Sequence, residues 1–165
     1  MSSTIDFERT SAMEISRQTH SILKSVRPEN IFRFPQGILG FEDVKEYVFL
    51  FNDKIEPFMF MQSLERSHLC FVSIGTFLIK PDYNLVLPED NVRFLELERP
   101  TDAMILSLVT VRKNVEDITA NLLSPIVVNM RNSRAQQVII ENSQNPVRYR
   151  IWENIDDAML RFRAG

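Results

Sequence analysis

Short stretches in which apolar and polar residues alternate recur along most of this chain. Alternation at every second residue is the period of a strand with one buried face. Residues 57–63 read Pro-Phe-Met-Phe-Met-Gln-Ser, so phenylalanines fall on one face and methionines on the other, and we expect this strand to be covered on both sides. The last two predicted strands are expected to pair with each other. The predicted strands are residues 32–34, 46–51, 57–63, 69–74, 104–112, 126–130, 136–141 and 147–152.

Helical signals are clearest in two places, although Ala12, Ile15 and Thr19 of the N-terminal extension also fall at helical spacing. Pro88, followed by Glu89 and Asp90, predicts a short helix, because proline suits the first helical turn and carboxylates there oppose the helix dipole favourably. A strand over residues 94–98 is the alternative for the end of that segment, since Glu and apolar residues alternate there. Apolar residues at helical spacing predict a second helix over 156–163.

These elements together indicate the fold class. Many short strands with turn signals at short intervals are typical of all-β proteins, so we expect a single-domain, antiparallel β-barrel-like or sandwich fold with one or two short helices. The β domain is expected over residues 30–152, after a flexible N-terminal extension at 1–29 and before a C-terminal helical tail at 153–165. Residues 77–87 are interpreted as an irregular link.

One stretch stands apart from the strand pattern. Residues 34–42 read FPQGILGFE and hold two of the four glycines of the chain. Because glycine tolerates a positive φ that other residues avoid, Pro35, Gly37 and Gly40 predict a strand end that turns through a tight, partly buried corner.

Composition narrows the class of protein. The chain has 165 residues, enough to bury one sizeable core. A single cysteine, Cys70, excludes an intramolecular disulfide, and no apolar run resembles a signal peptide or a membrane span, so we expect a cytoplasmic protein that does not bind a membrane. The net charge of −3 argues against direct binding of nucleic acid through its phosphates.

Candidate catalytic groups are sparse. His68 and Cys70 would share one face of a strand, a geometry that suits a nucleophile with its base or half of a metal site. We interpret Cys70 as a small hydrophobe packed in an apolar strand, and the carboxylates at helix starts as partners of the helix dipole. We therefore expect no catalytic residue, no bound metal and no cofactor.

Charge is distributed unevenly along the chain. Residues 80–102 carry six acids against three bases, and residues 131–150 carry four arginines against one acid. This bipolar pattern is typical of a protein that binds other proteins. The acidic residues that we select as candidates for partner binding are Glu89, Asp90, Glu96 and Glu98.

Five motifs follow one another in order. They are Phe34-Pro35-x-Gly37-Ile38-x-Gly40-Phe41-Glu42, Pro57-Phe58-x3-Gln62-Ser63, Val109-x-Val111, Asn121-Leu122-x2-Pro125-Ile126-x2-Asn129 and Gln137-Val138-Ile139. In order and spacing, across residues 30–152, they resemble the FliW family of flagellar assembly factors. The resemblance implies a cytoplasmic, monomeric, barrel-like protein that binds newly made flagellin and the translational regulator CsrA in competition. Export of flagellin would free the protein to capture CsrA, which then no longer represses flagellin mRNA.

The resemblance also implies candidate binding residues. Four polar candidates, Gln62, Asn121, Asn129 and Gln137, either contact a partner or are buried side chains that satisfy loop backbone. An acidic surface beside the basic RNA site of the regulator would repel the phosphates of RNA.

The alternative function for the whole protein is a small-ligand-binding or hydrolytic barrel. The remaining candidates are Phe34, Pro35, Gly37, Gly40, Phe41, Leu122 and Pro125.

Overall fold

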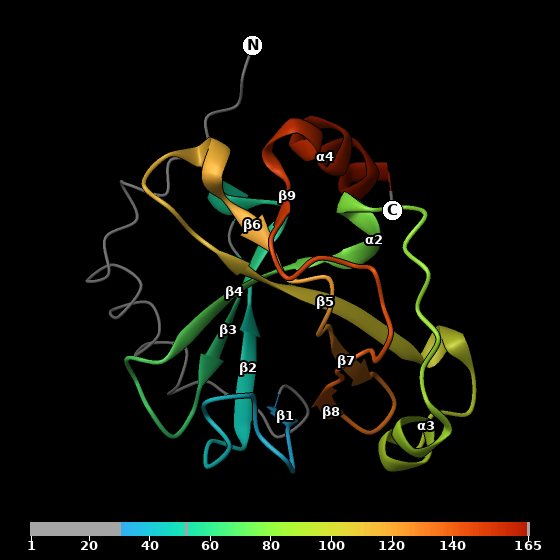
Figure 1. The fold of residues 1–165 in the computed structure, drawn as a ribbon. Helices are drawn as coiled ribbons and strands as arrows, with labels where there is room; N and C mark the ends of the chain where they lie inside the picture. The colour runs from blue at the N-terminus through green and yellow to red at the C-terminus, as the bar shows by residue number, and fades with distance from the viewer. Residues whose placement is uncertain (1–30, 52, 165) are drawn as a thin grey trace.

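Seven β-strands pair edge to edge and close on themselves as a barrel (Figure 1). The structure, a computed structural model, describes residues 31–51 and 53–164. The barrel strands are β1 (Ile31–Arg33), β2 (Glu46–Leu50), β3 (Phe58–Ser63), β4 (Cys70–Gly75), β5 (Ala103–Thr110), β7 (Ile126–Asn129) and β8 (Arg134–Gln137). Their order around the barrel is β4-β3-β2-β1-β8-β7-β5, and β5 pairs back with β4 to close the ring.

One strand pair of the barrel is parallel. Six of the seven neighbouring pairs are antiparallel, whereas β1 and β8 run in the same direction, with Arg33 opposite Arg134. Strand direction cannot alternate all the way around a closed ring with an odd number of members. The expected antiparallel barrel is therefore confirmed except for the single parallel pair that its closure requires.

The barrel interior is filled by alternate residues of its strands, as a small closed barrel demands. Tyr47 of β2, Met61 of β3, Leu106 of β5 and Ile126 of β7 all belong to this inner cluster and are at most 1% exposed. Phe34 completes it from the loop after β1. The other alternation of the same strands faces outward, so it needs a second layer to cover it.

Two covers lie on the outer wall. The helices of the described residues are α2 (Thr76–Ile79), α3 (Glu89–Leu95) and α4 (Ile155–Ala164), with 3-10 turns at Asp53–Ile55, Pro100–Asp102, Val115–Asp117 and Trp152–Asn154. Two short strands, β6 (Thr119–Ala120) and β9 (Tyr149–Arg150), extend the sheet from β5. One cover consists of α2, α4 and the β6–β9 segment over Phe58 and Phe60, and the other places Leu95 of α3 over Val127 and Val138. Figure 1 shows α2 and α4 above β5 in this view and α3 below it.

Most of the predicted elements are confirmed. The six predicted strands before residue 131 lie within two residues of the observed ones, and β3 is buried at all six positions, covered on both sides as expected. The helix after Pro88 is also confirmed. The strand alternative for residues 94–98 is wrong, because Glu96 adopts a left-handed conformation with φ 57° and caps the helix after Leu95.

The pairing near the C-terminal end differs from the prediction. The strand expected at 136–141 begins earlier, at Arg134, and pairs with β7 and β1. The segment expected to pair with it, 147–152, contributes only β9, which pairs with β6 instead. That pairing buries Ile151 beside Ile118 and Ala120 in the outer cluster. The alternation of apolar and polar residues within 147–152 cannot show this contact, because the partners are about 30 residues away in the sequence. Part of the link expected at 77–87 is helix α2.

The remaining expectations concern segments at the chain ends. The N-terminal extension predicted at 1–29 lies outside the described residues. Within residues 31–51 and 53–164, none of the helices has the length and apolar character that crossing a bilayer requires. Helix α4, in the predicted C-terminal tail, buries Ile155 and Ala158 against the barrel.

Candidate partner-binding surface

The glycine corner is a tight turn held by its own backbone. Gly37 has φ 67° and donates its N–H to the Phe34 carbonyl oxygen at 2.8 Å. Gly40 has φ 86° and donates to a carboxylate oxygen of Glu42 at 2.9 Å, which lowers the pKa of Glu42. A Cβ on Gly37 would lie 2.5 Å from the Cα of Glu42, so the corner needs glycine there for space as well as for φ.

Strand β8 connects this corner to helix α3. The Gln136 side chain donates to Gln36 of the corner at 2.8 Å and accepts from Asn91 of α3 at 2.9 Å. The next residue, Gln137, accepts a hydrogen bond from the backbone N–H of Leu39 at 2.9 Å. Two adjacent glutamines on one strand therefore hold the corner and α3 side by side.

The loop at 121–125 joins the same region. Asn121 accepts hydrogen bonds from the N–H groups of Leu123 and Ser124, both at 3.0 Å, which fixes the turn from its own side chain. Gln137 donates to the carbonyl oxygen of Ser124 at 3.4 Å. Hydrogen bonds therefore connect the corner at 34–42, β8, the 121–125 loop and α3 to one another.

Gln62 belongs to a neighbouring turn. Its side-chain nitrogen lies 3.0 Å from the carbonyl oxygen of Ser63 and 3.0 Å from that of Leu69, and its exposed fraction is 1%. An ion pair between Arg66 and Asp43 ties this turn to the chain leaving the corner. Gln62 thus shapes a loop beside the corner from a buried position.

Burial separates the sequence-predicted candidates into two groups. Pro35, Gly40 and the four acids are exposed, while Phe41, Asn121 and Gln137 are partly exposed. The others have almost no exposed side-chain surface, so any contribution they make to binding acts through the loops that they position. The buried candidates are Phe34, Gly37, Gln62, Leu122, Pro125 and Asn129.

The acidic and basic stretches meet instead of forming separate poles. Glu98 pairs with Arg131 at 2.5 Å, and this contact raises the pKa of the Arg131 guanidinium. Glu96 accepts a hydrogen bond from Asn132 at 3.0 Å. Among the described residues, Glu89 and Asp90 form ion pairs only with Arg93 of their own helix, so they are the candidate acids most available to a partner.

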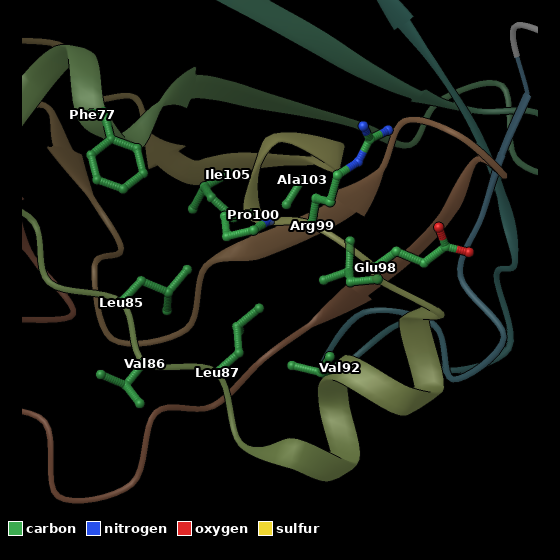
Figure 2. Close-up of a pocket in the computed structure, with 11 residues that line it drawn as sticks. Phe77, Leu85, Val86, Leu87, Val92, Glu98, Arg99, Pro100, Ala103 and Ile105 are labelled. Carbon is green, nitrogen blue, oxygen red and sulfur yellow. The ribbon is translucent and has the colours of Figure 1, made fainter.

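An apolar groove lies beside the acidic residues, between the two covers of the barrel wall (Figure 2). Its volume is about 490 Å³, and its walls come from α2, the 80–88 segment, α3 and the start of β5. Figure 2 shows Leu85 and Leu87 pointing toward Ile105. The sequence interpretation missed this groove, although the run Leu85-Val86-Leu87 in a supposed loop is the signal that could have revealed it.

The His68 and Cys70 pair does not form. Strand β4 begins at Cys70, and His68 lies in the preceding exposed turn, so the shared strand face does not exist. The described residues contain no group of three His, Cys, Asp or Glu side chains that could hold a metal ion. Burial raises the pKa of the Cys70 thiol to about 11.

The raised pKa of Cys70 predicts that its thiol reacts slowly in the native protein. The thiolate is the reactive species, so at pH 8 the native thiol should react with a chromogenic disulfide reagent on the order of 100-fold more slowly than in urea-unfolded protein. Stopped-flow absorbance would measure both rates. Equal rates would show that Cys70 is accessible and ionised in the native state.

Comparisons with known proteins agree with this architecture. A sequence profile described as FliW protein matches residues 16–151, beginning inside the stretch that the hydrophobic pattern assigns to an extension. The flagellar assembly factor FliW of Syntrophus aciditrophicus is 37% identical over 142 residues, 86% of this chain and 89% of that protein. The one from Treponema denticola is 32% identical over 152 residues, 92% and 97% of the two chains.

The fold is shared as well. A crystal structure of the flagellar assembly factor FliW superposes with a TM-score of 0.73 at 32% sequence identity, covering 76% of this chain and 88% of that one. The resemblance carried by the five sequence motifs is thereby confirmed. The chain belongs to the FliW family of flagellar assembly factors.

Proposed function

We propose that this protein is a cytoplasmic, monomeric binding protein for flagellin and for a CsrA-type translational regulator. By antagonising the regulator when flagellin has been exported, it couples flagellin synthesis to export. Membership of a family of flagellar assembly factors supports a role in flagellar assembly. The observation that carries the mechanism is the pair of exposed carboxylates, Glu89 and Asp90, on a helix held firmly against the barrel.

The mechanism is electrostatic. A regulator that binds RNA presents a basic site, and an acidic surface steers such a partner toward itself. Once α3 lies beside that site, its carboxylates repel RNA phosphates without occupying the RNA position. Glu89 and Asp90 suit this role because their side chains are 86% and 95% exposed, whereas Glu98 is engaged by Arg131.

Flagellin is expected to bind chiefly through apolar contacts. Reversing surface charge should therefore change its affinity less than that of the regulator. The two partners are expected to compete, since the resemblance to the family implies that each one displaces the other.

Reversing Glu89 and Asp90 to lysine should slow capture of the regulator, and with it RNA release, on the order of tenfold at low salt. The difference should shrink at high salt, where charges are screened. The measurement is RNA release from the purified regulator at two salt concentrations, alongside titration with flagellin. Reversal of Glu96 and Glu98 is less informative, because it removes contacts to Asn132 and Arg131 in a distant part of the sequence, whereas the ion pairs lost with Glu89 and Asp90 are those to Arg93 within the same helix.

The chain offers a matched control. Asp156 and Asp157 are likewise adjacent exposed acids in the first turn of a helix, α4, which lies in the other cover of the barrel. Asp156→Lys with Asp157→Lys changes the net charge equally and should leave RNA release unchanged. If both double variants cause the regulator to release RNA as fast as the unmodified protein does, the acidic residues of α3 are solvent-exposed charges with no part in the mechanism.

A further inference from the structure

Arg134, the first residue of β8, is a partly buried cation for which the described part of the chain supplies no acid. Its guanidinium forms no ion pair with residues 31–51 or 53–164, and its Nε is buried without a hydrogen-bond partner. One other arginine of these residues is partly buried, Arg66, and it pairs with Asp43. An unpaired buried donor on a charged group is costly, so Arg134 is a candidate for binding an anion.

The fold holds the Arg134 guanidinium in place. The ring of Phe94 in α3 packs against it, with 4.4 Å between the guanidinium carbon and the ring centroid. This contact stabilises the cation and leaves its charge in place. The backbone N–H of Arg134 donates to the side-chain oxygen of Asn132 at 2.9 Å, and Asn91 ties α3 to Gln136 on the same strand. The guanidinium is therefore positioned before any ligand arrives, which lowers the entropic cost of binding.

Arg33 adds a second cation beside it. In the parallel pair of β1 and β8, Arg33 lies opposite Arg134, so both side chains project from the same face of the sheet. The acids on the neighbouring elements have other partners. Glu46 of β2 lies 3.7 Å from Arg33, and the Glu96 carboxylate accepts a hydrogen bond from Asn132 at 3.0 Å. The guanidinium of Arg134 is thus the cation at this seam that has no acid of its own.

The chemistry of this group selects a carboxylate. A guanidinium presents its N–H groups in a planar fork that matches a carboxylate, and such charge-assisted pairs are strong. The net charge of −3 disfavours a nucleic acid as the source of the anion. A protein source is favoured because the adjoining corner exposes apolar surface. Leu39 is 69% exposed and donates its backbone N–H to Gln137 of β8, and Ile139 is 56% exposed two residues further on.

We propose that Arg134 anchors a second partner-binding site, which takes the carboxylate of a glutamate or aspartate side chain from a protein partner. The guanidinium donates hydrogen bonds to that carboxylate, and Arg33 adds to the attraction. This inference goes beyond the proposed function, which uses the acids of α3 and assigns no role to a cation.

The test follows the NMR signal of the Arg134 Nε–H while the full-length protein is titrated with the tripeptide Leu-Glu-Leu, capped at both ends, at constant ionic strength. Because this Nε is buried, its proton should exchange with water slowly enough to be observed. We expect a saturating shift with half-saturation on the order of 10 mM, the strength of one charge-assisted pair. The capped peptide Leu-Gln-Leu has the same shape without the charge and should bind at least about tenfold more weakly.

A variant pair tests the role of the planar fork. Arg134→Lys keeps the positive charge and loses the fork, so it should weaken binding of the glutamate peptide at least about threefold, measured from backbone amide shifts of β8. Arg112→Lys is the control, because Arg112 is an exposed arginine that forms no ion pair within the described chain. Circular dichroism would show that both variants are folded.

Four results would overturn the proposal. They are no saturating shift of the Arg134 signal, equal affinity of the glutamine peptide, saturation of the same signal by inorganic phosphate at a lower concentration than the glutamate peptide requires, and equal affinity of the Arg134→Lys and Arg112→Lys variants. The titration needs neither flagellin nor the regulator, so its outcome is independent of the RNA-release result.

Discussion

Replacing Gly37 with alanine should lower the free energy of unfolding by about 3 kcal/mol or more. Two costs combine at this position. The backbone sits at φ 67°, where a residue with a Cβ is disfavoured, and the new Cβ would lie 2.5 to 2.7 Å from backbone atoms of Glu42. The obstacle is main chain, so no side-chain rotation relieves it, and the corner itself must move.

Gly40→Ala separates the two costs. Gly40 also has a positive φ, 86°, but nothing lies within 4 Å of a Cβ built there, so the variant should lose only about 1 kcal/mol. Urea unfolding followed by circular dichroism would measure both variants. For a chain of this size, the Gly37 variant should melt about 6 to 12 °C lower than the unmodified protein. Equal stability losses would mean that conformation alone, without the clash, decides the corner.

Local pattern predicted the barrel strands because each strand carries its own burial signal. In β3 the alternation of phenylalanine and methionine matches two separate clusters, Phe58 and Phe60 outside the barrel and Met59 and Met61 inside it. The start of α3 was equally predictable from the sequence, because Pro88 and the two acids after it favour a helix start independently of distant residues.

Pairing partners were less predictable, because they depend on contacts distant in sequence. Strands β6 and β9 have two residues each, too few for a periodic signal, and they form because Ile118 and Ile151 share an outer cluster. The strand order around the ring, with β1 beside β8, follows from barrel closure and has no local signature.

The candidate site was predicted in its parts and not in its assembly. The glycine corner was visible because two glycines mark it, but the glutamine contacts that place it beside α3 join residues 100 positions apart, as in the pair Gln36 and Gln136. Likewise, the acidic and basic stretches are each visible, whereas their meeting at Glu98 and Arg131 is a product of the fold. The buried state of Asn129 also requires the structure, since a polar residue next to a turn is ordinarily exposed.

Asn129 is expected to be the most costly polar residue to replace. Its side chain, 1% exposed, donates to the carbonyl oxygens of Leu95 at 2.8 Å and Glu96 at 3.1 Å, and accepts from the N–H of Arg131 at 2.9 Å. One amide therefore joins the C-terminal end of α3 to the turn after β7. Asn129→Leu keeps the number and branching of the side-chain heavy atoms and leaves these groups without a partner, so it should cost about 2 to 4 kcal/mol.

The loss should also be local to α3. Because the carbonyl oxygens at its end would lose their partner, backbone amides of α3 should exchange with deuterium faster than those of the barrel strands. Hydrogen exchange followed by mass spectrometry would show this alongside urea unfolding. Since α3 carries Glu89 and Asp90, the same variant should weaken capture of the regulator even under conditions in which the barrel stays folded.

Asn132→Ala is the matched control for this prediction. Asn132 is exposed and contacts the same helix end, donating to Leu95 at 3.4 Å and to the Glu96 carboxylate at 3.0 Å. Water can replace its hydrogen bonds, so the variant should lose less than about 1 kcal/mol and leave α3 exchange nearly unchanged. If Asn129→Leu is as mild as Asn132→Ala, the helix end is held by the apolar contacts of Leu95, and the buried amide is not what positions α3.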